Sequence, residues 1–171
     1  VWFTNASYDY MQTTTPVSLA TISTGAQPSV HGVVSDRWFD YVGNKQVNLI
    51  DDSKEQSVNY SSGSGNYSPR QLHAETISDA VVESNDQSII RTIAVEPLSA
   101  IVMAGHAGEA YWMENLQSDW TTSTYYTKEL PRWILDYNRN DSNEDFIIKS
   151  WTPLFDIDKY VNSQVISINV A

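Results

Sequence analysis

The chain contains no cysteine, few basic residues and no long apolar run. Without cysteine it can form neither disulfides nor thiolate metal sites. Ten lysine and arginine residues stand against 21 acidic residues, which gives a net charge of −11 and a pI near 4.4. A surface with this charge repels phosphate backbones, so we expect no nucleic-acid partner. No stretch of about 18 apolar residues occurs, so we expect no membrane partner either.

The apolar pattern alternates between short extended runs and helical stretches along 171 residues, the size of one domain. It predicts strands over residues 1–10, 32–41, 45–49, 89–95, 110–113, 121–126 and 161–170. It predicts helices over residues 16–23, 68–83 and 130–137, and a loop over residues 57–67. Strands that alternate with helices favour an α/β layered fold. The turn at residues 42–44 adds a small inserted antiparallel piece.

A hydroxyl group is predicted at the start of the first helix. Thr15 suits the N-cap, Pro16 the first helical position and Gly25 the helix end. Orphan N–H groups and the positive end of the helix dipole meet there, which makes a natural anion site. Two interpretations stay open: Thr15 is a nucleophile facing a phosphate, or it is only a cap. As a cap, its replacement in Thr15→Ala should cost about 1 kcal/mol.

The other chemically active side chains favour structural roles. The three histidines are widely spaced, and His73 is predicted on the surface of a helix. His31 and His106 each neighbour a glycine, where hydrogen bonding in a turn is favoured over a role as metal ligand. Apolar neighbours place Trp38, Trp112 and Trp133 in the core or in domain packing. The many carboxylates fall in polar, loop-like stretches and are interpreted as solvated charge.

Eight blocks of sequence carry a resemblance in their order and spacing. They are Tyr8-Asp9-Tyr10, residues 15–25, Pro28 to Val33, Trp38-Phe39-Asp40, Ser68 to Leu72, Ala104-Gly105-His106, Gly108 to Trp112, and Thr122 to Tyr126 continuing to Leu130-Pro131-Arg132-Trp133. With these blocks the chain resembles the alkaline phosphatase superfamily. It is most similar to the monomeric bacterial alkaline phosphatases of the Bacteroidetes type, and more distantly similar to nucleotide pyrophosphatases/phosphodiesterases.

The resemblance implies a periplasmic or secreted hydrolase of small phosphate esters, mono- or diesters, with two zinc ions. Its members form a covalent phospho-enzyme through a Thr or Ser at a helix start. The resemblance places this nucleophile, which is also a metal ligand in a complete site, on Thr15. A shift in register would move it to Thr13 or Thr14. No oligomeric state is implied.

Four positions depart from the family pattern. The family has an Asn that contacts the phosphate where this chain has Asp36, so Asp36 is the predicted substrate-binding position. A Lys and an Arg of the phosphatases correspond to Glu96 and Leu98, and a His corresponds to Leu19. The added anion and the lost cations remove charge-assisted contacts to a phosphoryl group. Arg37, next to Asp36, is the one nearby compensating charge.

The family's remaining metal ligands are expected before Val1 and after Ala171. We therefore expect residues 1–171 to form a single partial domain, the N-terminal-to-middle portion of the family fold. One hydroxyl cannot hold zinc, which needs three or four ligands, so no zinc is expected to bind tightly to this chain alone. Two hypotheses follow. The chain is a fragment of a metal-dependent phosphoesterase, inactive by itself, or a degenerate member that serves as a binding or structural module.

Overall fold

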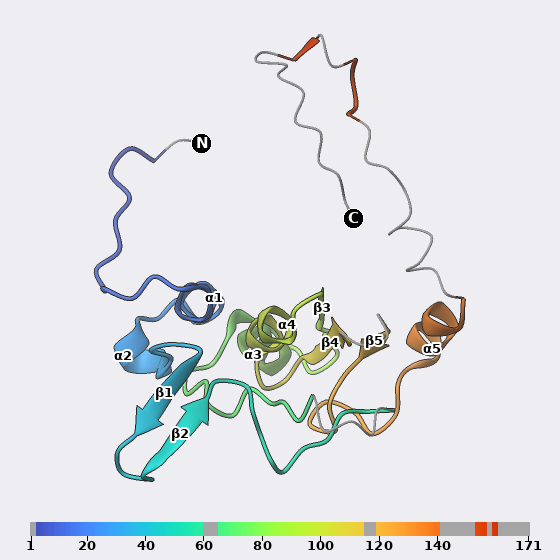
Figure 1. The fold of residues 1–171 in the computed structure, drawn as a ribbon, viewed down its shortest axis with the longest axis horizontal. Helices are drawn as coiled ribbons and strands as arrows, with labels where there is room; N and C mark the ends of the chain where they lie inside the picture. Colours follow the sequence, from blue (N-terminus) through green and yellow to red (C-terminus); the bar gives the residue numbers. More distant parts are fainter. Residues whose placement is uncertain (1–2, 60–64, 115–118, 141–152, 157–158, 161–171) are drawn as a thin grey trace, which may run out of the picture. The chain divides into compact units, whose positions relative to one another are not determined.

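The computed structural model describes residues 3–59, 65–114, 119–140, 153–156 and 159–160. The chain divides into two units, residues 1–140 and 141–171. All helices and strands identified in the described residues belong to the first unit (Figure 1). In chain order these are α1 (Thr15–Thr24), α2 (Pro28–His31), β1 (Arg37–Asp40), β2 (Lys45–Asn48), α3 (Ile77–Ser84), β3 (Arg91–Ala94), α4 (Pro97–Ala104), β4 (Glu109–Met113), β5 (Trp120–Thr121) and α5 (Arg132–Arg139). None of the described helices is long and apolar enough to cross a membrane.

A three-stranded sheet in the order β3-β4-β5 organises the unit. Strands β3 and β4 are parallel and are connected through α4, while β4 and β5 are antiparallel. This strand–helix–strand unit, with helices packed on the sheet, confirms the predicted α/β layered class.

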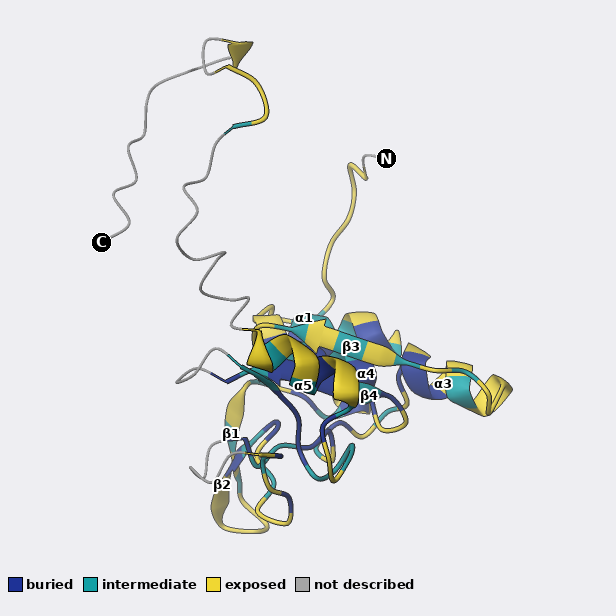
Figure 2. Ribbon diagram, turned by 90° about the vertical axis from the view of Figure 1, so that its right-hand side faces the viewer, coloured by how far each residue is buried: buried dark blue, intermediate teal, exposed yellow. Residues whose placement is uncertain are grey.

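The alternation of side chains along β4 divides the core into two clusters. Ala110 and Trp112 face α1 and α4 and join the larger cluster, whereas Tyr111 faces α5 and packs with Ile134. Helix α4 therefore packs on one face of the sheet, with α1 packed against α4, and α5 packs on the other face. Figure 2 shows that β3, unlike β4, alternates between exposed and half-buried residues.

The predicted antiparallel piece is confirmed. Strands β1 and β2 form a hairpin in which Arg37 is paired with Asn48 and Asp40 with Lys45. The carboxylate of Asp40 accepts a hydrogen bond from the N–H of Val42 at 2.9 Å, which stabilises the turn.

Several predicted boundaries are wrong. The described part of residues 1–10 contains no strand, and the strand predicted at 121–126 is reduced to β5. The helix predicted at 68–83 begins only at Ile77, because Thr76 and Asp79 form a capping box that starts it there. Helix α4 and the short α2 were not predicted. The strand predicted at 161–170 lies outside the described residues.

Candidate active site

Helix α1 begins with an open first turn. Thr14 occupies the N-cap position with extended backbone angles (φ −73°, ψ 162°), and its side chain makes no capping hydrogen bond. Its carbonyl oxygen accepts the first helical bond from the N–H of Ser18 at 2.9 Å. Pro16 has no N–H, so helix geometry leaves the N–H groups of Thr15 and Val17 without an intrahelical acceptor. The first turn carries no acidic side chain, so the positive end of the helix dipole is not neutralised by its own helix.

Thr15 is therefore the first helical residue and not the N-cap, so the prediction was off by one residue. Its side chain is exposed and makes no hydrogen bond to any part of the chain that the structure describes. The expected loss of about 1 kcal/mol in Thr15→Ala depends on capping by this side chain, which the structure does not show, so a smaller loss is expected. The predicted helix end is confirmed, since Gly25 adopts the left-handed conformation (φ 64°) that favours glycine.

The base of this turn is fixed by packing. Pro16, Val17 and Ala20 are buried, and the last two belong to the larger core cluster together with Ile101 of α4. The hydroxyl of Thr15 thus stands on a helix whose opposite face is held in the core. A group that must be presented to a ligand in a defined position benefits from such a rigid support.

Asp36 lies between α2 and β1 and presents an exposed, ionised carboxylate. A hydrogen bond from the hydroxyl of Ser35 (3.0 Å) lowers the pKa of Asp36, with help from nearby backbone N–H groups and the charge of Arg37. Its carbonyl oxygen accepts the N–H of Leu49 at 3.0 Å, which ties it to the hairpin. No hydrogen bond links Asp36 to Thr15, although both residues are described. The structure thus places Thr15 in the first turn of α1 and Asp36 in the segment between α2 and β1 of the same unit.

The two positions at which the resemblance implies a cation, Glu96 and Leu98, lie at the start of α4. Glu96 is the N-cap residue of this helix, is exposed, and makes no capping hydrogen bond. Leu98 is half-buried and packs against the larger core cluster, as does Leu19 of α1. Leu98 and Leu19 therefore contribute to packing between α1, α4 and the sheet, where a charged side chain would be costly.

Sequence reasoning missed the most hydrogen-bonded carboxylate of the unit, Asp79. It accepts the N–H groups of Thr76 (2.8 Å), His106 (2.7 Å) and Ala107 (2.8 Å), and its Oδ2 lies 3.0 Å from Nδ1 of His106. Gly105 (φ 65°) precedes this turn, and an added Cβ would collide with Thr76 and Asp79. The Thr-x-x-Asp spacing is a capping-box pattern that predicts the local part of this network, the start of a helix after Thr76, but not the contacts with His106 and Ala107.

Both candidate histidine ligands are engaged in hydrogen bonds. Nε2 of His106 lies 2.9 Å from the carbonyl oxygen of Leu72, so both of its ring nitrogens face acceptors. Nδ1 of His31 accepts the N–H of Val33 (3.1 Å) and its Nε2 lies 3.2 Å from the hydroxyl of Thr21. Burial lowers the pKa of His31, which favours the neutral ring. The predicted hydrogen bonding in turns is confirmed for both. His73 is exposed as predicted, but it lies in a loop and not on a helix.

The described residues do not fit the zinc pair that the resemblance implies. Among them, no three His, Cys, Asp or Glu side chains lie together in a way that could hold a metal ion. Thr15 would be a single oxygen ligand, and the rings of His31 and His106 are occupied. We therefore derive no reaction step through a metal from these residues.

Comparison with known proteins decides the family. The model of type I phosphodiesterases / nucleotide pyrophosphatases matches residues 1–167. The chain belongs to this family. Alkaline phosphatase PafA of Elizabethkingia meningoseptica is 33% identical over 162 residues, which cover 93% of this chain and 30% of the relative. Alkaline phosphatase PhoV of Synechococcus elongatus is 29% identical over 161 residues, which cover 93% of this chain and 29% of the relative.

A solved structure supports the same relationship. The crystal structure of a PafA mutant superposes with a TM-score of 0.81 at 32% sequence identity, covering 88% of this chain and 30% of the mutant chain. The resemblance to the alkaline phosphatase superfamily and the predicted fold class are confirmed. The chain spans about 30% of the length of these two alkaline phosphatases. The roles of Thr15 and Asp36 remain predictions.

Proposed function

We propose that this chain carries the nucleophile of a phosphate-ester hydrolase, with the hydroxyl of Thr15 attacking phosphorus. The observation that carries the proposal is the uncapped first turn of α1, where the exposed hydroxyl of Thr15 stands beside backbone N–H groups that have no hydrogen-bond acceptor among the described residues. Such a turn binds phosphate through its N–H groups and its dipole. Family membership supports the same chemistry.

The proposed reaction proceeds in two steps. The oxygen of Thr15 gives up its proton and forms a bond to phosphorus while the ester P–O bond breaks, and the leaving oxygen takes up one proton as the alcohol departs. Water then attacks phosphorus and one of its protons returns to the oxygen of Thr15 as the bond between that oxygen and phosphorus breaks. This step releases phosphate when the substrate is a monoester, or the remaining monoester when it is a diester. In both steps the N–H groups of the first turn would donate to phosphoryl oxygens.

This chain alone is not expected to complete these steps. No basic side chain hydrogen-bonds the hydroxyl of Thr15 within the described ranges. A threonine hydroxyl needs an activating group to attack at neutral pH. We therefore propose that activation, including any contribution from the two zinc ions of the family, depends on parts of a family-length protein beyond the described residues. A periplasmic or extracellular location belongs to the same proposal.

The charge of Asp36, at the predicted substrate-binding position, favours a phosphodiester as substrate. The superposed PafA mutant carries substitutions of one threonine, one asparagine, one lysine and one arginine. These are the residue types that the resemblance predicts at Thr15, Asp36, Glu96 and Leu98, and this chain keeps only the threonine. An ionised Asp36 repels the two charges of a phosphomonoester more strongly than the single charge of a diester.

The same substitutions support a second candidate, a non-catalytic module on the same scaffold. Leu98 packs against the core and Asp36 is anionic, so neither would bind a phosphate as the family's cations and amide do. On this alternative the open turn of α1 is only the start of a helix. The two candidates differ in whether Thr15 becomes phosphorylated.

The experiment uses a chimera in which this chain replaces the matching segment of PafA. We expect hydrolysis of bis-p-nitrophenyl phosphate in preference to p-nitrophenyl phosphate. In quenched reactions we expect a covalent adduct on the peptide that contains Thr15, a p-nitrophenyl phosphate group from the diester and a phosphate group from the monoester. Thr15→Ala should abolish both, whereas the matched controls Thr13→Ala and Thr14→Ala should retain turnover. A folded chimera without turnover supports the module, and turnover that survives Thr15→Ala contradicts the nucleophile.

A further inference from the structure

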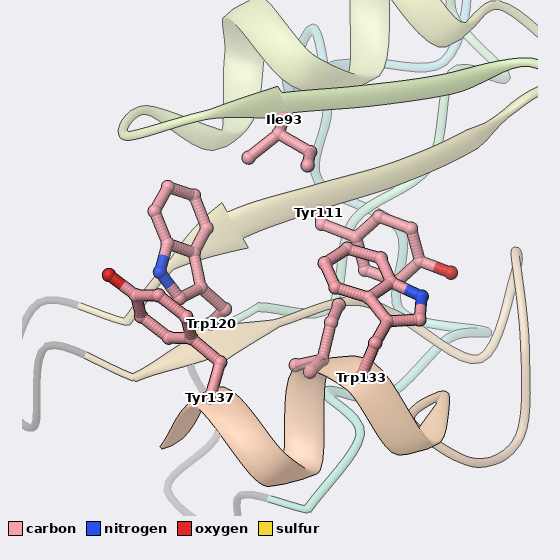
Figure 3. A pocket seen from close by; sticks show the side chains of 6 residues that line it. Ile93, Tyr111, Trp120, Trp133 and Tyr137 are labelled. Carbon is pink, nitrogen blue, oxygen red and sulfur yellow. The ribbon is translucent and has the colours of Figure 1, made fainter. Parts of the chain in front are cut away.

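Two pockets of the first unit differ in composition. One lies between β3, β4, β5 and α5 and is lined by apolar and aromatic side chains, with Ile93 projecting toward Trp120, Trp133 and Tyr137 (Figure 3). Trp133, which the sequence predicts in the core or in domain packing, is 44% exposed. The other pocket, of about 390 Å³, lies along the β1–β2 hairpin, and Val47 is the one apolar residue among the described residues that line it. We call it the hairpin pocket.

Two cations of an otherwise acidic chain line the hairpin pocket. Neither Arg37 of β1 nor Lys45 of β2 forms an ion pair with a carboxylate of the described residues, whereas Arg70 is paired with two. The carboxylate of Asp51 also lines the pocket; burial raises its pKa and the charge of Arg37 acts in the opposite direction. Two cations thus face one carboxylate in a chain of net charge −11, which favours an anionic ligand at this place.

The uncharged polar side chains of the hairpin pocket have hydrogen-bonding groups to spare. Those of Gln46, Ser53 and Gln71 make no hydrogen bond to the described part of the chain. Asn48 accepts the N–H of Ile50 with its Oδ1 at 3.3 Å, which leaves its amide N–H groups as donors. Amide and hydroxyl groups that both donate and accept suit the hydroxyl groups of a carbohydrate.

Backbone contacts hold the walls of the hairpin pocket in place. The strand register sets Arg37 opposite Asn48. Asp51 forms an antiparallel bridge with Tyr67, and Gln71 directly precedes a residue of the larger core cluster. A pocket that is formed before its ligand arrives loses little free energy to ordering on binding.

We propose that the hairpin pocket binds an anionic carbohydrate, a sugar that carries a phosphate or carboxylate group, with Arg37 and Lys45 on the anionic group and Asp51 accepting hydrogen bonds from sugar hydroxyls. The carboxylate favours a sugar over a bare anion, because it repels inorganic phosphate but accepts from hydroxyl groups. None of the described residues that line the pocket is aromatic, so it offers a nucleobase no ring to stack on.

The test titrates the isotope-labelled 171-residue chain with glucose 6-phosphate and with glucuronate, and follows the NMR shifts of its backbone amides. We expect shifts at Arg37, Asn48 and Gln71 with the anionic sugars, and the tighter of the two identifies the anionic group. Glucose and inorganic phosphate are the comparison ligands, and each should bind at least about tenfold more weakly, because each lacks one of the two recognised groups.

Matched substitutions separate the pocket from the charge of the whole chain. Arg37→Gln and Lys45→Gln should each weaken binding of the tighter sugar by about tenfold, since each removes a charge-assisted contact. Lys128→Gln makes the same change in net charge at an exposed position outside the pocket, and should change the affinity by less than about twofold. Arg37 and Lys45 are exposed, so the variants should fold, and their amide spectra report it.

Four results would overturn the inference. Glucose binding as tightly as the anionic sugars would remove the role of the cations, and inorganic phosphate binding as tightly would remove the role of the sugar. An equal loss in Lys128→Gln would assign binding to net charge. Shifts confined to the first turn of α1, or no shifts at all, would leave the hairpin pocket without a ligand. The readout requires neither Thr15 nor turnover, so failure of the proposed hydrolysis leaves this test intact.

Discussion

Helices α1 and α3 both begin beside threonines, yet their first turns differ in almost every contact. At α3, the side chain of Thr76 accepts the N–H of Asp79 (3.2 Å) while Asp79 accepts the N–H of Thr76, and both of these residues are buried. At α1, Thr14 makes no capping bond and Thr15 is exposed. The start of α3 is built for stability, whereas the start of α1 leaves donors for an external acceptor.

The largest expected effect on stability is at the hydrogen-bonded first turn of α3. Asp79→Ala removes the acceptor of three backbone N–H groups, of the Thr76 hydroxyl and of the His106 ring. Because these donors are left without their partner, we expect the free energy of unfolding to fall by about 3–5 kcal/mol. Urea unfolding followed by circular dichroism measures this change. Asp86→Ala, at an exposed turn position after α3, is the matched control and should change stability by less than about 0.5 kcal/mol.

A smaller difference is expected between the two N-cap residues themselves. Thr76→Ala should lower the free energy of unfolding by about 1–2 kcal/mol, since its side chain caps α3 from a buried position. Thr14→Ala should have almost no effect, because this side chain caps nothing. Equal losses in the two variants, measured as shifts in the urea midpoint, would contradict the contrast between the helix starts.

The hydrogen-bonded first turn of α3 should also make the stability of the chain depend on pH. Burial alone would raise the pKa of Asp79, but hydrogen bonds from Thr76, His106 and Ala107 outweigh burial and lower it. Its folded-state pKa thus lies below the unfolded value, so its contribution to stability is present above the unfolded pKa of about 3.9 and is lost as pH falls through the folded pKa. Unfolding curves between pH 7 and pH 3 should show this decline, and Asp79→Asn should reduce it. An unchanged decline in Asp79→Asn would assign it to other carboxylates.

The elements that local chemistry determines were predicted from the sequence. The hairpin followed from its turn and alternation, and α1 was placed within one residue by Thr-Pro and Gly25. Helix α4 was missed because its run of apolar residues is buried nearly all round and has no amphipathic period. Residues 1–10 alternate like a strand, but their described part pairs with no other strand. Alternation without a neighbouring strand does not make a sheet.

The candidate site was predictable only in part, for a physical reason. The cap pattern and the family register both point to Thr15, and the structure confirms that it lies at the helix start. The interior-like residues 89–95 predicted a buried strand, but the strand observed there is half-exposed. Burial depends on what packs against a strand, which its own sequence does not contain. In the same way, the sequence around Thr15 does not contain the group that would activate its hydroxyl.

The smallest expected effect on stability is at the residue with the largest proposed role. Thr15→Ala should change the free energy of unfolding of the 171-residue chain by less than about 0.5 kcal/mol, because this exposed side chain makes no hydrogen bond to the described residues. In the PafA chimera, the same substitution should eliminate the phosphothreonine adduct, while Thr15→Ser should retain it, because serine keeps a hydroxyl at the helix start. A loss near that of Thr76→Ala would show that Thr15 does cap α1 in solution. A structural residue would affect stability in both proteins alike; a nucleophile would affect only the chemistry.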